Sequence, residues 1–177
     1  MLAAWEPLEP RPLLALAPRR PERFPDVAKR IEEAGHRLLR RTGPSSEGAD
    51  VYLLDSVGEL ASLYREAAVA FLGGSLVPKG GHNPIEAWAA GVPVLSGPHT
   101  RNFAEIMRRG EEIGILRAVA DGAELRSALA EVFSGPAATS EKGARAARFV
   151  SENRGAAVAT AELVLPLLRP DGRSATT

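Results

Sequence analysis

The stretch between Phe71 and Glu86 carries residues that can bind an anion. An apolar run ending at Leu72 predicts a buried strand, and two glycine pairs follow, the second being Gly80 and Gly81. Glycine lets backbone N–H groups approach a phosphate because no side chain covers them. The stretch has neither the GK[ST] of a Walker loop nor the G-x-G-x-x-G dinucleotide pattern. It therefore indicates an anion site of another kind, or an ordinary strand-to-helix connection.

A helix is predicted to begin directly after this loop. Asn83 suits the N-cap, since its side-chain oxygen can accept a hydrogen bond from a free backbone N–H group. Pro84 suits the first helical position, and Glu86 can reach back as a capping box. If Glu86 instead faces a ligand, its carboxylate can accept from two vicinal hydroxyls. His82, just before the cap, could donate to a phosphate or a sugar.

Two further candidates follow other predicted strands. Arg19 comes after the apolar run Leu13–Ala17, and a guanidinium there could pair with a phosphate; it could equally be a solvated loop arginine. Glu59 opens the helix after the run Val51–Leu54. It could accept a hydrogen bond from a base or a sugar, or simply favour the helix dipole.

Short apolar runs alternate with helical patterns along the chain. Strands are predicted at 13–17, 38–41, 51–54, 67–72, 92–95 and 114–119, and helices at 25–34, 58–67, 84–90, 102–109, 121–133, 140–153 and 156–168. This alternation predicts an α/β fold, a Rossmann-like parallel sheet with helices on both faces. Ligands bind such sheets beyond the carboxyl ends of the strands, so the candidate loops should gather at one edge.

Composition excludes several classes of function. The 177 residues carry 22 basic and 22 acidic side chains, which gives no electrostatic case for nucleic acid or an anionic membrane surface. Without cysteine there is no disulfide and no thiolate zinc site, and the three histidines are too scattered to indicate a metal site. No apolar run reaches the roughly 20 residues needed to span a bilayer. No Ser-His-Asp or paired-carboxylate pattern predicts catalytic residues within the chain.

The segment Phe71–Ile106, with GGHNPIE followed by GPHTRNF, resembles the C-terminal half of bacterial 3-deoxy-D-manno-octulosonic acid (Kdo) transferases. LALAPRRPERF at 14–24 and DSVGEL at 55–60 extend the resemblance over most of residues 13–150. It implies a GT-B glycosyltransferase of two Rossmann-like domains. In that family the C-terminal domain holds the donor CMP-Kdo, and the N-terminal domain holds a lipid A precursor and a catalytic carboxylate base.

The resemblance also implies the reaction and its place. Kdo would be transferred to the lipid A precursor in lipopolysaccharide biosynthesis, at the cytoplasmic face of the inner membrane, without a metal or other cofactor. It implies three CMP-binding segments, whose residues in this sequence are Pro18 and Arg19, then Val57, Gly58 and Glu59, then Asn83, Pro84, Ile85 and Glu86. The loop before the third segment adds Gly80, Gly81 and His82 as candidates for CMP binding. Glu86 would then bind the ribose hydroxyls.

Three parts are expected along the chain. Residues 1–12 would be the remnant of a preceding helix, 13–153 the donor-binding domain, and 154–177 a C-terminal helix and frayed tail. The family's first strand has no counterpart here, so we expect a gap in the sheet beside its switch point. Without the acceptor domain and its base, the chain alone is expected to transfer nothing. A truncated chain, a gene fragment and a split enzyme all remain open.

Other functions fit the same residues. The glycine loop and a ribose-binding glutamate also occur in GT-B enzymes that use UDP-sugars, either transferases or 2-epimerases. A non-catalytic module or a fragment without a cellular role is a further alternative. A preference for UDP over CMP would distinguish a UDP-sugar enzyme from a CMP-Kdo domain.

Overall fold

The computed structural model describes residues 1–45, 47–155 and 164. Its strands form two three-stranded sheets in which every pairing is parallel. One sheet has the order β1-β3-β2, with β1 at Leu14–Leu16, β3 at Val51–Leu53 and β2 at Leu38–Arg40. The other has the order β4-β5-β6, at Ala70–Leu72, Val94–Ser96 and Leu116–Ala118. Each predicted strand is therefore present, shorter than the apolar run that indicated it.

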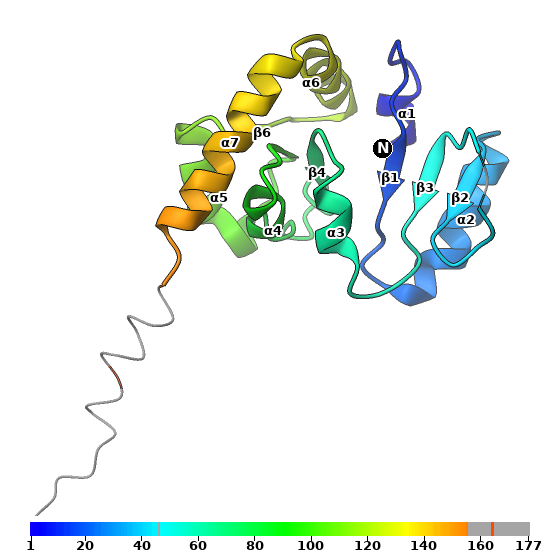
Figure 1. Cartoon of the computed structure of the whole chain (residues 1–177), viewed down its shortest axis with the longest axis horizontal. Helices are drawn as coiled ribbons and strands as arrows, with labels where there is room; N and C mark the ends of the chain where they lie inside the picture. Colours follow the sequence, from blue (N-terminus) through cyan, green and yellow to red (C-terminus); the bar gives the residue numbers. More distant parts are fainter. Residues whose placement is uncertain (46, 156–163, 165–177) are drawn as a thin grey trace, which may run out of the picture.

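The two sheets are not joined by hydrogen bonds between β1 and β4, which lie at their inner edges (Figure 1). The Leu14 N–H donates to the carbonyl oxygen of Asp50, and the Leu16 carbonyl oxygen accepts the N–H of Leu54, so both groups point to the β3 side. Because neighbouring residues of a strand point their backbone groups to opposite sides, Ala15 directs its N–H and C=O groups away from β3. The sheet is thus interrupted at the position where the resemblance predicts a missing strand.

Helices cover both sheets. Their bounds are α1 Leu2–Trp5, α2 Phe24–Glu33, α3 Leu60–Tyr64, α4 Ile85–Ala89, α5 Ala104–Glu112, α6 Gly122–Ser134 and α7 Pro136–Glu152, with 3-10 turns at Pro21–Arg23 and Arg101–Phe103. The last helix begins earlier than predicted because Pro136 suits a first helical turn. Asn102 does not cap α5 as predicted; it lies inside a 3-10 turn, and Phe103 precedes the helix. The predicted helix at 156–168 lies outside the described residues, apart from Val164.

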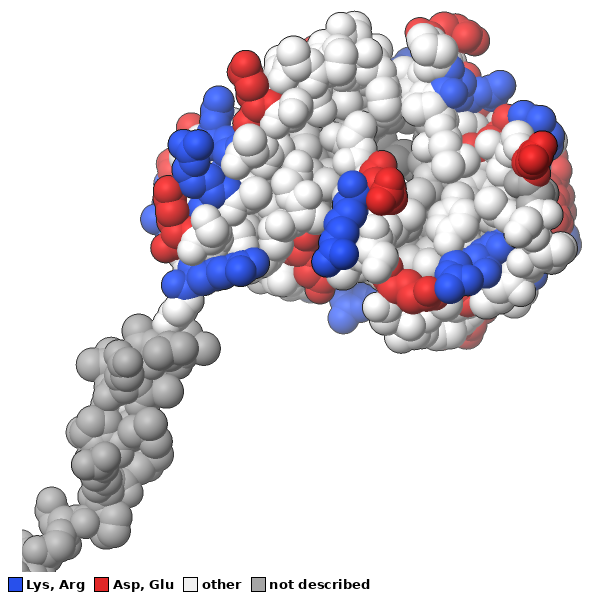
Figure 2. All heavy atoms as spheres, in the orientation of Figure 1, with Lys and Arg blue, Asp and Glu red and all other residues white. Residues whose placement is uncertain are grey.

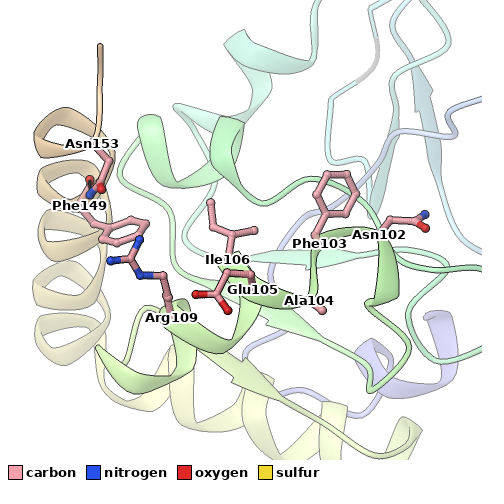
Figure 3. A pocket seen from close by; sticks show the side chains of 8 residues that line it. All are labelled: Asn102, Phe103, Ala104, Glu105, Ile106, Arg109, Phe149 and Asn153. Carbon is pink, nitrogen blue, oxygen red and sulfur yellow. Dashed lines mark hydrogen bonds between the residues drawn. The ribbon is translucent and has the colours of Figure 1, made fainter. Parts of the chain in front are cut away.

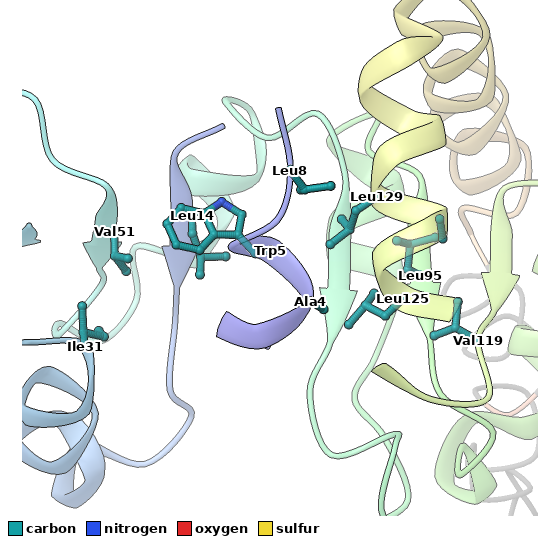
Figure 4. Close-up of a cluster of buried hydrophobic side chains, with 11 residues drawn as sticks. Ala4, Trp5, Leu8, Leu14, Ile31, Val51, Leu95, Val119, Leu125 and Leu129 are labelled. Atoms are coloured by element: carbon teal, nitrogen blue, oxygen red, sulfur yellow. The ribbon is translucent and has the colours of Figure 1, made fainter. Parts of the chain in front are cut away.

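The segment before β1 joins the two halves of the molecule through the core. Ala4, Trp5 and Leu8 are buried between side chains of the first sheet and those of α6 (Figure 4). Trp5 is 2% exposed, and its indole N–H donates to the carbonyl oxygen of Pro12 at 2.7 Å. Residues predicted only as a helix remnant therefore supply apolar area to the core.

A second buried cluster fixes α4 against α7. Trp88 of α4 is fully buried and meets the ring of Phe149 edge-on, with the ring centroids 5.7 Å apart. The two helices approach closely at Gly143, where a Cβ atom would lie 2.1 Å from the carbonyl oxygen of Gly91. This contact holds the helix that follows the glycine loop.

No helix in the described part of the chain has the length and hydropathy to cross a bilayer.

Candidate functional site

The loops with the predicted site residues follow β1, β3 and β4, and the two after β1 and β3 lie at one end of the first sheet (Figure 1). Two electrostatic effects show which side chains are close together. Burial first, and then the charge of Arg19, lowers the pKa of His82. Burial, and then the charge of Glu86, raises the pKa of Tyr64 in α3. The structure therefore places Arg19 within electrostatic range of His82 in the glycine loop, and Glu86 within electrostatic range of Tyr64 in α3.

The glycine loop offers consecutive backbone donors. The N–H groups of Gly80, Gly81, His82 and Asn83 donate no hydrogen bond within the described residues, and both glycines are buried. Their φ angles of 92° and 69° lie in the region that favours glycine. At Gly80 a Cβ atom would lie 2.5 Å from Nδ2 of Asn102. Buried N–H groups normally find a partner, so this loop is suited to bind an anion.

Ser75 fixes the position of this loop relative to the loop after β5. Its hydroxyl is fully buried, donates to the carbonyl oxygen of Leu72 at 2.5 Å and accepts the N–H of Gly97 at 2.7 Å. The N–H of His99 donates to the Ser75 carbonyl oxygen at 2.9 Å. Sequence reasoning assigned Ser75 only to the end of the strand, because nothing in the sequence indicates a partner 22 residues away.

The start of α4 differs in detail from the prediction. Asn83 Oδ1 accepts the N–H of Ile85 at 3.0 Å, but the helix begins at Ile85, one residue after Pro84. Glu86 is exposed and makes no side-chain hydrogen bond or ion pair within residues 1–45, 47–155 and 164, so the capping box is not formed. Because α4 has only five residues, its dipole adds little, and the loop N–H groups are the main anion donors.

Arg19 is exposed, and its guanidinium makes no ion pair or hydrogen bond with any described residue. It follows the half-buried Pro18 and lies close enough to His82 to affect the titration of that imidazole. An unpaired guanidinium beside unpartnered N–H groups matches what a phosphate requires.

Glu59 is held by residues that sequence reasoning did not select. Arg41 donates to Oε1 from Nε at 3.0 Å and from Nη2 at 2.8 Å, and the hydroxyl of Ser56 donates to Oε2. The Ser56 hydrogen bond first, and then Arg41, lowers the pKa of Glu59. Val57 and Gly58 lie between Ser56 and Glu59 in the chain, and Val57, at the tip of the loop, is 79% exposed. The one sequence signal for Arg41 is its place at the carboxyl end of a predicted strand.

A surface hollow lies elsewhere on the molecule. It has a volume of about 360 Å³ and lies between α5 and α7, where Figure 3 shows Phe103, Ile106 and Phe149 around it. None of the predicted site residues lines it.

On the face shown in Figure 2, basic and acidic side chains are interspersed. The described residues contain no group of three or more His, Asp or Glu side chains placed to hold a metal ion.

The chain is similar in sequence to several 3-deoxy-D-manno-octulosonic acid transferases. No protein-family model matches the chain. It is 38% identical over 162 residues to a 3-deoxy-D-manno-octulosonic acid transferase of Haemophilus influenzae, and 43% identical over 129 residues to one of Bordetella pertussis. These alignments cover 90% and 71% of this chain, but only 38% and 28% of the relatives. The chain thus spans well under half the length of these curated relatives.

A solved structure matches most of both chains. The crystal structure of the C-terminal CMP-Kdo binding domain of WaaA from Acinetobacter baumannii superimposes with a TM-score of 0.78 at 30% sequence identity. The match covers 86% of this chain and 81% of that domain.

Proposed function

The chain belongs to the Kdo transferase family, as the C-terminal part of such an enzyme, and we propose that it binds the donor CMP-Kdo. The observation that carries the proposal is a loop of unpartnered backbone N–H groups with a guanidinium in electrostatic range of it. The N–H groups of Gly80, Gly81, His82 and Asn83 have no partner among the described residues, and the charge of the unpaired Arg19 reaches His82. A nucleoside monophosphate sugar presents one phosphate diester to such a site, and charge-assisted hydrogen bonds of this kind are the strong ones.

The two glutamates would bind the nucleoside. Glu86 is exposed beside the glycine loop and has no capping bond, so its two oxygens can accept the 2′ and 3′ hydroxyls of a ribose. Glu59 already accepts hydrogen bonds from Arg41 and Ser56. A carboxylate has about four acceptor positions, so it retains about one for a base or sugar donor. Pro18, Val57 and Gly58 complete the proposed contacts.

The proposed reaction needs a second domain. There a carboxylate base takes a proton from a hydroxyl of a lipid A precursor, which attacks the anomeric carbon of Kdo. The bond from that carbon to the phosphate oxygen breaks, and CMP leaves. Arg19 and the N–H groups of Gly80 and Gly81 stabilise the charge that develops on the phosphate. We propose that this proceeds without a metal or other cofactor, at the cytoplasmic face of the bacterial inner membrane.

Calorimetric titration of the chain with CMP and with UDP tests the donor assignment. CMP should bind more tightly than UDP. Arg19→Ala should weaken CMP binding about 10- to 100-fold, the effect of losing a hydrogen bond between charged groups. Arg20→Ala removes the same charge from the next residue and should change the affinity less than about twofold. Tighter binding of UDP would instead indicate a UDP-sugar domain, and no binding of either nucleotide would refute the proposal.

A further inference from the structure

Glu59 is held by a specific arrangement of donors from two elements. Arg41 lies just beyond the end of β2, Ser56 lies in the loop after β3, and together they occupy both carboxylate oxygens. The side chains of Arg41 and Glu59 are 51% and 39% exposed. An exposed ion pair of this kind adds little to stability, so its presence calls for another explanation.

We propose that Arg41 is a positioning residue for donor binding: it holds the Glu59 carboxylate in the orientation that accepts a hydrogen bond from the nucleotide, and it does not contact the phosphate itself. This inference rests on the proposed function. It assigns different roles to two arginines at the same edge of the sheet, since Arg19 is unpaired and Arg41 is neutralised by its partner.

The physical reason is the freedom of the glutamate side chain. A free glutamate loses up to about 2 kcal/mol of rotamer entropy when a ligand fixes it. Two N–H groups of Arg41 converge on Oε1 while the Ser56 hydroxyl holds Oε2, so both oxygens are fixed in advance; a lysine ammonium lacks this rigid pair of donors. The ligand then meets an acceptor whose direction is already set, which raises its affinity.

The neighbouring residue holds the other end of the same loop. Arg40 donates to the buried Asp55, whose oxygens also accept the N–H and the hydroxyl of Thr42. Arg40, the last residue of β2, therefore fixes Asp55, and the next residue, Arg41, fixes Glu59. The residues between these anchors include the exposed Val57, so the part of the loop that faces outward is supported from β2 at both ends.

The chain offers a matched control at the opposite end of the same two strands. Arg37, just before β2, donates to Asp50, just before β3, from Nε at 3.2 Å and from Nη2 at 3.1 Å. This arginine–carboxylate pair joins the segments just before β2 and β3, at the amino ends of the strands and away from the candidate site. Arg37→Ala therefore removes an equivalent ion pair without touching the proposed donor contacts.

The first experiment measures CMP affinity by calorimetry in Arg41→Ala, Arg41→Lys, Glu59→Ala and the double variant Arg41→Ala/Glu59→Ala. Arg41→Ala should weaken binding about three- to tenfold, the effect of losing one oriented hydrogen bond. Lysine should rescue little of this loss, and the double variant should bind like Glu59→Ala alone. Arg37→Ala should bind like the unaltered chain. Equal losses from Arg37→Ala and Arg41→Ala, or an additive double variant, would overturn the proposal.

A second measurement needs no nucleotide. A carbon-13 titration of the Glu59 carboxyl group should show its pKa rising toward the ordinary value in Arg41→Ala, with faster amide exchange at Val57 and Gly58. An unchanged titration and unchanged exchange would show that Arg41 does not fix Glu59, whatever the calorimetry gives. If the unaltered chain binds no CMP while the titration behaves as expected, the proposed function fails and the positioning of Glu59 still stands.

Discussion

Replacing Asp55 by alanine should destabilise the protein by about 3 kcal/mol, because it leaves donors without the buried carboxylate that they share. The Asp55 side chain is 1% exposed. It accepts Nη2 of Arg40 at 2.7 Å, and the N–H and hydroxyl of Thr42 at 2.9 and 2.6 Å. Burial is the largest single influence on the pKa of Asp55 and raises it. The hydrogen bonds from Thr42 and then Arg40 together outweigh burial, so the net effect is a lowered pKa.

The expected loss follows from how much of this network is buried. Removing one partner of a buried ion pair costs about 3–5 kcal/mol. The Arg40 side chain is 43% exposed, so water can solvate the released guanidinium, which places the loss at the lower end of that range. For a chain of this size, about 3 kcal/mol corresponds to a fall in melting temperature of about 6–12 °C. Asp55→Asn retains an acceptor for the Thr42 N–H group and should lose less.

Urea and thermal unfolding at pH 7, followed by circular dichroism, measure this loss. Asp50→Asn serves as the control, since it breaks the more exposed pair with Arg37 and should shift both transitions much less. A loss below about 1 kcal/mol in Asp55→Ala, or one no larger than that of Asp50→Asn, would refute the reasoning that burial makes this carboxylate important.

Three further predictions concern pH, the open sheet edge and a close contact. The folded-state pKa of Asp50 is lowered to about 2, and that of Glu59 is also lowered. The stability that these carboxylates contribute is therefore present above about pH 5 and lost as the pH falls toward 2. The midpoint of urea unfolding should fall across this pH range, and should fall less in a variant that lacks both carboxylates. Ala15→Pro should be tolerated far better than Leu14→Pro in thermal unfolding, because only the Leu14 N–H is hydrogen-bonded on the β3 side. Gly97→Ala should lower both the melting temperature and CMP affinity, since its Cβ atom would lie 2.3 Å from a backbone oxygen of the glycine loop; an unchanged affinity would show that the two loops are not coupled.

Local sequence signals predicted the anion site, and the family resemblance alone supplied the choice of CMP-Kdo as its ligand. The glycine loop, the Asn83-Pro84 start of α4 and the arginine after β1 are all contiguous motifs, and the comparisons support the family that they indicate. The roles of the individual site residues stay predictions. The placement of Arg19 beside His82 is the structural finding that agrees most directly with them.

The elements themselves were determined by the sequence alone. Apolar runs, prolines and glycines act on covalent neighbours, so the strands and most helix starts could be predicted from the residues beside them. The family resemblance predicted the interruption between β1 and β4. The strand order and the partners that Ser75, Arg41 and Asp55 find in other elements were decided only by the tertiary structure. Each of these joins groups at least 13 residues apart in the chain. Such contacts depend on how separate elements pack, and that packing cannot be predicted from the residues on either side of a position in the chain.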